Sequence, residues 1–281
     1  MRVFNGWWRW LGGMGLSAGL LLALQQGGKQ LLTRQAAAAR EIIFARAIGD
    51  VAPKGEKVYG RKQPGRLELL VVGDSIAAGL GAGRRKETIG GRIAKALSRR
   101  TGKSVHLFTA AVVGAQTTAV LDQIDRLPAD YRPDLAIVIV GGNDVTHRVP
   151  TSRSVAALAE VIERLQALGA NVVVATCPNL GAIRPLRQPL RTLAARRSAF
   201  LATAQRRTAL ARGAHAVSLG RVVGRIFLAE PETMLSLDMF HPSPGGYRRI
   251  AQALLPSVLA AAGEDQDLPK GHWAPRPPKV G

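Results

Sequence analysis

Short apolar runs alternate with longer segments of helical pattern through the middle of this 281-residue chain. The apolar runs are typical of strands buried on both faces of a parallel sheet. This alternation predicts an α/β fold, a three-layer α/β/α sandwich around a mainly parallel five-stranded sheet. The predicted strands are 67–72, 104–110, 135–141, 171–176 and 214–218, and the predicted helices lie near 88–100, 115–126, 152–168, 190–212 and 244–261.

The first of these runs ends abruptly in Gly73-Asp74-Ser75, and small, Gly-rich sequence follows. The pattern indicates a buried strand that delivers a serine to the edge of a sheet. Ligand sites of parallel sheets lie beyond the carboxyl ends of the strands, where a rigidly held hydroxyl can act as a nucleophile. Gly-Asp-Ser is also ordinary turn sequence, so the motif alone does not separate a nucleophile from a turn.

Three further polar signals follow predicted strands or lie in loops. An Asp three residues before a His, Asp238 and His241, can place a carboxylate against one imidazole nitrogen. The other nitrogen is then free to take a proton from a serine. Gly114 and Asn143 each follow an apolar run, and a glycine amide and an Asn side chain are donors that an oxyanion hole requires.

These four signals, in this order, resemble the SGNH (GDSL) hydrolase superfamily of bacterial GDSL-type esterases and lipases. The resemblance covers about residues 66 to 262. Each block alone is unspecific, but four blocks in order and in strand context form a specific pattern. The matching blocks are Gly73-Asp74-Ser75, Gly114, Gly141-Gly142-Asn143-Asp144 and Asp238-Met239-Phe240-His241.

The resemblance implies a flavodoxin-like fold and a serine esterase that acts on short- to medium-chain acyl esters or lipids without a cofactor. It implies a triad of Ser75, His241 and Asp238, and an oxyanion hole built from Ser75, Gly114 and Asn143. One alternative keeps this chemistry but makes the protein an acyltransferase or deacetylase on envelope glycans. A second alternative is a non-enzymatic, basic, membrane-tethered binding module.

The charge balance is strongly basic, with a formal net charge of +20. Such a charge suits nucleic acid, anionic lipid or acidic polymers. The basic residues are scattered, no zinc spacing or RNA-binding aromatic motif is present, and aromatic residues make up only 5%. We therefore expect no specific nucleic-acid partner and favour an anionic membrane surface. The single cysteine, Cys177, leaves the redox compartment open.

The N-terminus carries an uncharged, apolar segment from Leu11 to Leu24, preceded by three tryptophans. It is short for a full span of about 20 residues but fits a signal-peptide core. Because no cleavage site is close, an uncleaved signal anchor is favoured over a cleaved peptide or a buried helix. The protein is thus expected at the cell membrane or secreted, with its orientation and oligomeric state open. The predicted units are 1–29 (anchor or signal peptide), 30–65 (juxtamembrane helix and linker), 66–262 (catalytic domain) and 263–281 (disordered tail).

Overall fold

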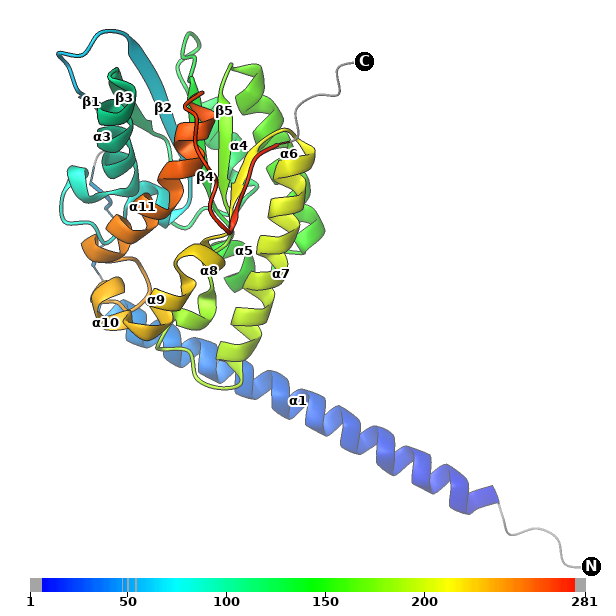
Figure 1. The fold of residues 1–281 in the computed structure, drawn as a ribbon. Helices are drawn as coiled ribbons and strands as arrows, with labels where there is room; N and C mark the ends of the chain where they lie inside the picture. The colour runs from blue at the N-terminus through cyan, green and yellow to red at the C-terminus, as the bar shows by residue number, and fades with distance from the viewer. Residues whose placement is uncertain (1–6, 47, 50, 54, 276–281) are drawn as a thin grey trace, which may run out of the picture.

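A seven-stranded sheet forms the centre of the computed structural model (Figure 1). The structure describes residues 7–46, 48–49, 51–53 and 55–275, with the backbone alone for 7–24. The strand order is β1-β3-β2-β4-β5-β6-β7; the five inner strands are parallel and the two outer ones antiparallel. The strands are β1 (Lys57–Tyr59), β2 (Arg66–Gly73), β3 (Ser104–Thr109), β4 (Leu135–Ile139), β5 (Asn171–Ala175), β6 (His215–Val217) and β7 (His272–Trp273).

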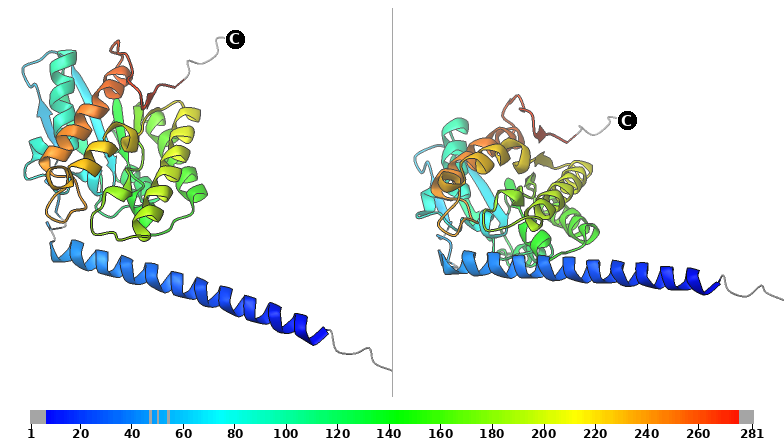
Figure 2. Two further views of the ribbon diagram at one scale, coloured as in Figure 1. Left: turned by 60° about the horizontal axis from the view of Figure 1, so that its bottom comes forward. Right: turned by 90° about the horizontal axis from the view of Figure 1, so that it is seen from below.

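Helices cover both faces of the sheet (Figures 1 and 2). The longer helices are α1 (Trp7–Ala45), α3 (Ile89–Thr101), α4 (Ala119–Asp125), α6 (Thr151–Ala167), α7 (Leu190–Ala211) and α11 (Pro244–Ala261). The shorter ones are α2 (Ser75–Ala78), α5 (Gly142–Thr146), α8 (Leu219–Val222), α9 (Gly224–Ala229), α10 (Pro231–Met234) and the 3-10 turns η1 (Arg85–Glu87) and η2 (Leu180–Ala182).

The side chains of β2 point alternately to the two faces of the sheet, and each face has its own hydrophobic core. Leu69 and Val71 point into a core that α3 and α11 complete, whereas Leu70 and Val72 point into a core shared with α4, α6 and α7. Each side chain of a strand points to the face opposite its neighbour's, so a strand covered on both faces must be apolar throughout. The apolar run that predicts β2 is therefore continuous because both faces of this strand are buried.

The predicted α/β class and the three-layer arrangement are confirmed, but the strand count is wrong. The five predicted strands form the parallel centre of the sheet, and two short antiparallel strands extend it. The prediction of a disordered tail is wrong for the part that the structure describes. Trp273 of β7 packs against the guanidinium groups of Arg206 and Arg221, which lie 4.7 and 5.7 Å from its ring centroid.

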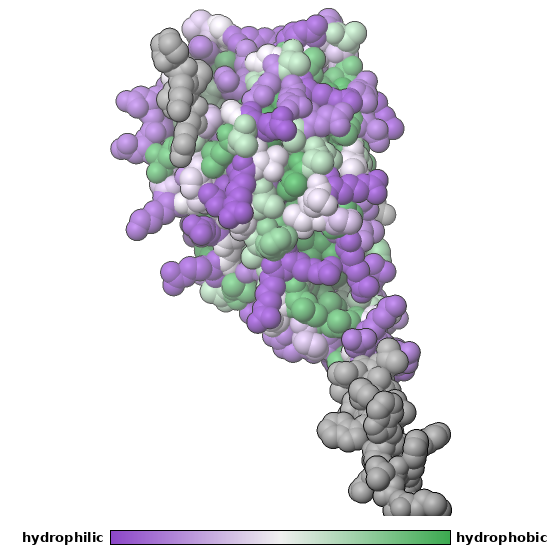
Figure 3. Space-filling view, turned by 90° about the vertical axis from the view of Figure 1, so that its right-hand side faces the viewer, coloured by the Kyte–Doolittle hydropathy of each residue, from purple (hydrophilic) through white to green (hydrophobic). Residues whose placement is uncertain are grey.

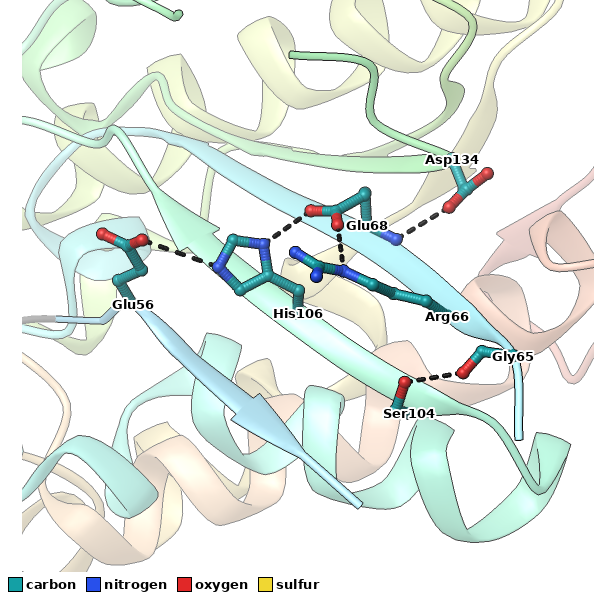
Figure 4. A network of polar contacts seen from close by, with 7 residues as sticks. All are labelled: Glu56, Gly65, Arg66, Glu68, Ser104, His106 and Asp134. Atoms are coloured by element: carbon teal, nitrogen blue, oxygen red, sulfur yellow. Dashed lines mark hydrogen bonds and ion pairs between the residues drawn. The ribbon is translucent and has the colours of Figure 1, made fainter. Parts of the chain in front are cut away.

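A polar network fixes the first edge of the sheet, where β1 lies within the predicted linker (Figure 4). The ring of His106 in β3 lies 2.6 Å from the Glu68 carboxylate and 3.5 Å from that of Glu56, which precedes β1. Glu68 also pairs with Arg66, and its backbone N–H donates to Asp134 at 2.7 Å. These contacts hold the residue before β1 and the strands β2 and β3 together at this edge of the sheet.

α1 is one continuous helix where the sequence predicts an anchor and a separate juxtamembrane helix. It runs beside the carboxyl end of the sheet, and its N-terminal half extends beyond the body (Figure 2). The Gln35 side chain donates to the Gln188 carbonyl at 2.5 Å and accepts from the Leu190 N–H at 3.2 Å, while Ala39 is buried. Among the helices described, none combines the length and hydropathy that crossing a bilayer requires.

Candidate active site

The serine predicted as a nucleophile lies where β2 ends. Gly73 has φ 137°, and a Cβ there would lie 1.9 Å from the Ile139 carbonyl oxygen, so only glycine fits. Asp74 then caps α2, with its carboxylate accepting the Ile76 N–H at 3.0 Å. The strand, the obligatory glycine and the cap together fix Ser75 as the first residue of α2, at the carboxyl edge of the sheet.

The structure brings Ser75, His241 and Asp238 into one hydrogen-bonded chain. His241 Nε2 lies 3.0 Å from Ser75 Oγ, and His241 Nδ1 lies 2.6 Å from Asp238 Oδ2. An ionised carboxylate can only accept hydrogen bonds, so Nδ1 carries the ring proton and Nε2 is left as the acceptor toward the serine. This is the arrangement that proton transfer from a serine hydroxyl requires.

The loop that carries Asp238 and His241 is closed on itself. Leu235 and Pro242 form an isolated antiparallel bridge, and the Ser236 N–H donates to the His241 carbonyl at 2.7 Å. Directly afterwards Ser243 caps α11 through the Gly246 N–H at 3.0 Å. The imidazole is therefore held between a closed loop and a helix start.

Hydrogen bonds keep the Asp238 carboxylate ionised. Burial raises its pKa, but the His241 ring and the backbone N–H groups of Phe240 and His241, both at 3.0 Å from Oδ1, outweigh that effect. The net result is a pKa below the usual range. An ionised Asp238 can orient the imidazole and stabilise its protonated form.

The two predicted oxyanion donors lie at the same edge of the sheet, Gly114 in the turn after β3 and Asn143 in α5. Asn143 lines the pocket around Ser75, and its amide donates one hydrogen bond to the Ala115 carbonyl at 3.1 Å, which leaves its second N–H available. Gly114 follows β3 with φ 82°, and its N–H makes no hydrogen bond with the residues that the structure describes. Gly114 is not among the residues that line the pocket.

Two buried carboxyl groups lie close to the turn that carries Ser75. Asp144 accepts from the Ser154 hydroxyl at 2.6 Å and from the Thr117 N–H at 3.1 Å. Burial, together with the nearby charge of Asp144, raises the pKa of Asp74 to about 7 in spite of its backbone hydrogen bonds. Through the N–H groups of Ile76 and Thr117, the two carboxyl groups hold the backbone on either side of the site.

An apolar pocket opens beside Ser75, and its empty space amounts to about 740 Å³ when the solvent-filled mouth is counted with it. One wall is the segment 178–183 after β5, and the other comes from α8, α9 and the loop before His241. The sequence did not indicate the second wall, because its apolar residues are indistinguishable from core positions. The apolar lining includes Ile76, Leu180, Ile183, Leu219, Val223, Phe227, Leu235, Phe240 and Ile250.

A metal centre finds no support in the described part of the chain, where no three His, Cys, Asp or Glu side chains are grouped to hold an ion. Cys177 is buried, and burial first, then the charges of Asp74 and Asp144, raises the pKa of its thiol well above the usual value. A thiol with a raised pKa is a poor nucleophile.

Comparison with known sequences agrees with this geometry. The model of the GDSL-like lipase/acylhydrolase family matches residues 71–249. The chain is also 37% identical over 262 residues to the GDSL-like esterase Rv1075c of Mycobacterium tuberculosis, an alignment that covers 89% of this chain and 83% of the relative.

Solved structures show the same fold at low sequence identity. TesA superposes with a TM-score of 0.56 at 22% identity, covering 69% of this chain and 99% of TesA. An acetylxylan esterase from Geobacillus stearothermophilus superposes with a TM-score of 0.52 at 16% identity, covering 77% and 98% of the two chains. At such identities the likeness concerns the fold alone.

Proposed function

This chain belongs to the GDSL-like lipase/acylhydrolase family and is a carboxylic ester hydrolase, and from that premise we propose that Ser75 is its nucleophile. The observation that carries the proposal is the hydrogen-bonded chain from Ser75 Oγ through His241 to Asp238, with distances of 3.0 and 2.6 Å. Membership of an esterase family argues against the non-enzymatic alternative.

In the proposed reaction, Ser75 Oγ attacks the ester carbonyl while its proton passes to His241 Nε2. The negative charge that develops on the carbonyl oxygen is stabilised by N–H groups of Ser75, Gly114 and Asn143. Collapse of this intermediate breaks the ester bond, and the alcohol leaves with the proton from His241. Water then gives a proton to His241 and attacks the acyl-enzyme; as the bond to Ser75 Oγ breaks, His241 returns that proton to Oγ, and the acid is released.

We infer that the acyl chain occupies the apolar pocket. Its lining is mainly apolar, with a small number of polar side chains that include Ser75, Asn143 and His241, as is usual for small-molecule sites. Burying a methylene contributes about 0.8 kcal/mol, which corresponds to roughly fourfold in kcat/KM for each added carbon. Esters of medium-length acids should therefore be better substrates than acetates until the pocket is filled.

A series of p-nitrophenyl esters of graded chain length tests this assignment. Gly224 begins α9 and lines the pocket, and a Cβ there meets nothing closer than 3.9 Å, so the backbone tolerates a side chain that projects into the space. Gly224→Leu should lower kcat/KM for octanoate about tenfold or more while leaving acetate nearly unchanged. Gly28→Leu, in α1, where a Cβ meets nothing within 4 Å and which is outside the lining, is the control. A uniform loss across all esters would contradict an acyl pocket.

The glycan alternative is separated by the same assay. An acyltransferase would partition the acyl group to an added sugar acceptor, whereas a hydrolase would release free acid at an unchanged rate. The apolar lining of the pocket favours an acyl chain over a sugar.

We also propose that the N-terminal segment attaches the enzyme to a membrane. Leu11 to Leu24 are uncharged and apolar, and the chain carries a net charge of +20 that would attract anionic headgroups. Leu31 in α1, and Leu193 and Phe200 in α7, are exposed. Figure 3 shows apolar side chains directly above the point where α1 leaves the body. Fractionation of cells that express the full chain tests this attachment.

A further inference from the structure

Gln205 joins two strand ends next to the candidate active site. Its side chain comes from α7 and is completely buried. Its amide nitrogen donates to the Val140 carbonyl at 2.9 Å, and its amide oxygen accepts from the Cys177 N–H at 2.7 Å. Both ends of one side-chain amide are thus used by backbone groups that follow β4 and β5.

The bridge lies where the pairing of β4 and β5 ends, and this position explains why a side-chain amide is needed there. The register between β4 and β5 ends at the pair Ile139 and Ala175, where the two strands diverge to form the pocket. Beyond that pair, the Val140 carbonyl and the Cys177 N–H no longer reach each other, and a buried polar group without a partner is costly. The Gln205 amide replaces the missing ladder hydrogen bonds.

Gln205 also lies next to the residue that leads into α5, the short helix that carries Asn143. Gly141 follows Val140 with φ 129°, and a Cβ there would lie 2.8 Å from Gln205 Nε2 and 3.1 Å from the Cys177 Cβ. α5 begins at the next residue, and Asn143 is its second position. Gln205 therefore lies directly against Gly141, two residues before Asn143, and leaves no space for a side chain at that position.

Given the proposed role of Asn143 in the oxyanion hole, on which this depends, we propose that Gln205 is a positioning residue that sets the distance of the Asn143 amide from Ser75. A misplacement of about 1 Å at such a donor can cost on the order of 10²-fold in rate. Loss of the bridge should thus lower kcat and leave ground-state binding in the apolar pocket largely intact.

The chain supplies a matched control in Gln123 of α4. This glutamine is also buried, and its amide accepts from the Gly73 N–H at 2.9 Å and donates to the Gly73 carbonyl at 2.8 Å. It therefore braces the strand end before Ser75, not the loop of Asn143. Gln123 and Gln205 make the same kind of contact at two different parts of the site.

The test is a double-mutant cycle on the full chain, with p-nitrophenyl butyrate as the probe. Gln205→Met and Gln123→Met are each combined with Asn143→Ala, and kcat is referred to the number of sites that a phosphonate probe labels. Gln205→Met alone should lower kcat about 10- to 100-fold with KM within about twofold. In the Asn143→Ala background it should change kcat less than about threefold, whereas Gln123→Met should cause the same loss in both backgrounds.

Equal losses for Gln205→Met in the two backgrounds, or no loss in either, would overturn the assignment. An unchanged kcat in Asn143→Ala alone would instead refute the oxyanion role itself, and the single mutant reveals this before the cycle is run. Circular dichroism and thermal melting report the fold of every variant. Should Gln205→Met not fold, Gln205→Glu keeps the size and the acceptor for Cys177 and enters the same cycle with the same expected coupling.

Discussion

The carboxyl group of Asp74 provides a quantitative test of the electrostatics close to the turn that carries Ser75. Asp74→Asn keeps the size of the side chain and one oxygen to accept the Ile76 N–H, but it removes a group that can ionise. Burial raises the pKa of Asp74 from 3.8 to about 7 in the folded protein. The substitution therefore isolates the free energy of charging this buried site beside Asp144.

The sign follows from proton linkage. Between the two pKa values the folded protein retains a proton that the unfolded chain has released, so the native protein loses stability as pH rises through this window. One pKa unit corresponds to about 1.4 kcal/mol, so the loss approaches about 4 kcal/mol between pH 4 and pH 8. Asp74→Asn lacks this loss. Its free energy of unfolding, measured relative to that of the wild-type protein, should therefore rise by about 4 kcal/mol from pH 4 to pH 8.

Urea denaturation followed by circular dichroism, repeated at intervals between pH 4 and pH 8, measures the two free energies of unfolding. Asp122→Asn removes an exposed carboxyl group from α4 and serves as the control, for which the curves of mutant and native protein should run parallel. If the pH curves of Asp74→Asn and the wild-type protein are also parallel, the pKa of Asp74 is not raised in the folded protein, whatever the absolute free energies of unfolding.

Two further changes test the site and its surroundings. Asn143→Ala should lower kcat by about 10²–10³ with little change in KM, because one oxyanion donor is lost; a pure KM effect would show that Asn143 only binds the ground state. Deleting residues 1–48 should move the protein out of the membrane fraction and retain hydrolysis of short esters, since α1 contacts the body through Gln35 and Ala39 and not through the pocket lining. A folded but inactive truncation would mean that α1 completes the site.

The strands that position the site were predictable because double burial imposes continuous apolar runs. β2 and β4 occur where the runs indicate, and Ser75 and Asn143 follow them. The three-residue spacing of Asp238 and His241 was equally informative, because a closed loop of that length brings a carboxylate to a neighbouring imidazole. Local chemistry at strand ends thus carried most of the information about the site.

Features that depend on distant partners could not be predicted in this way. β7 lies in a segment of charged and Pro-rich composition, and its order comes from pairing with β6 and from arginines that flank Trp273. The bridge made by Gln205 has no sequence signal, since a glutamine in a helix is usually exposed. The pocket wall formed by α8 and α9 could not be predicted for a related reason. Val223 and Phe227 are apolar, and apolar residues are equally common in the lining of a cavity and in a core.

Covalent labelling tests the central claim most directly, namely that Ser75 is the nucleophile activated by His241. An organophosphonate ester should modify one serine, and mass spectrometry of the digested protein should place the adduct on Ser75. Ser75→Ala should take up no label and lose ester hydrolysis while retaining its circular dichroism spectrum and melting temperature. An adduct on a different serine, or undiminished hydrolysis by Ser75→Ala, would contradict the account.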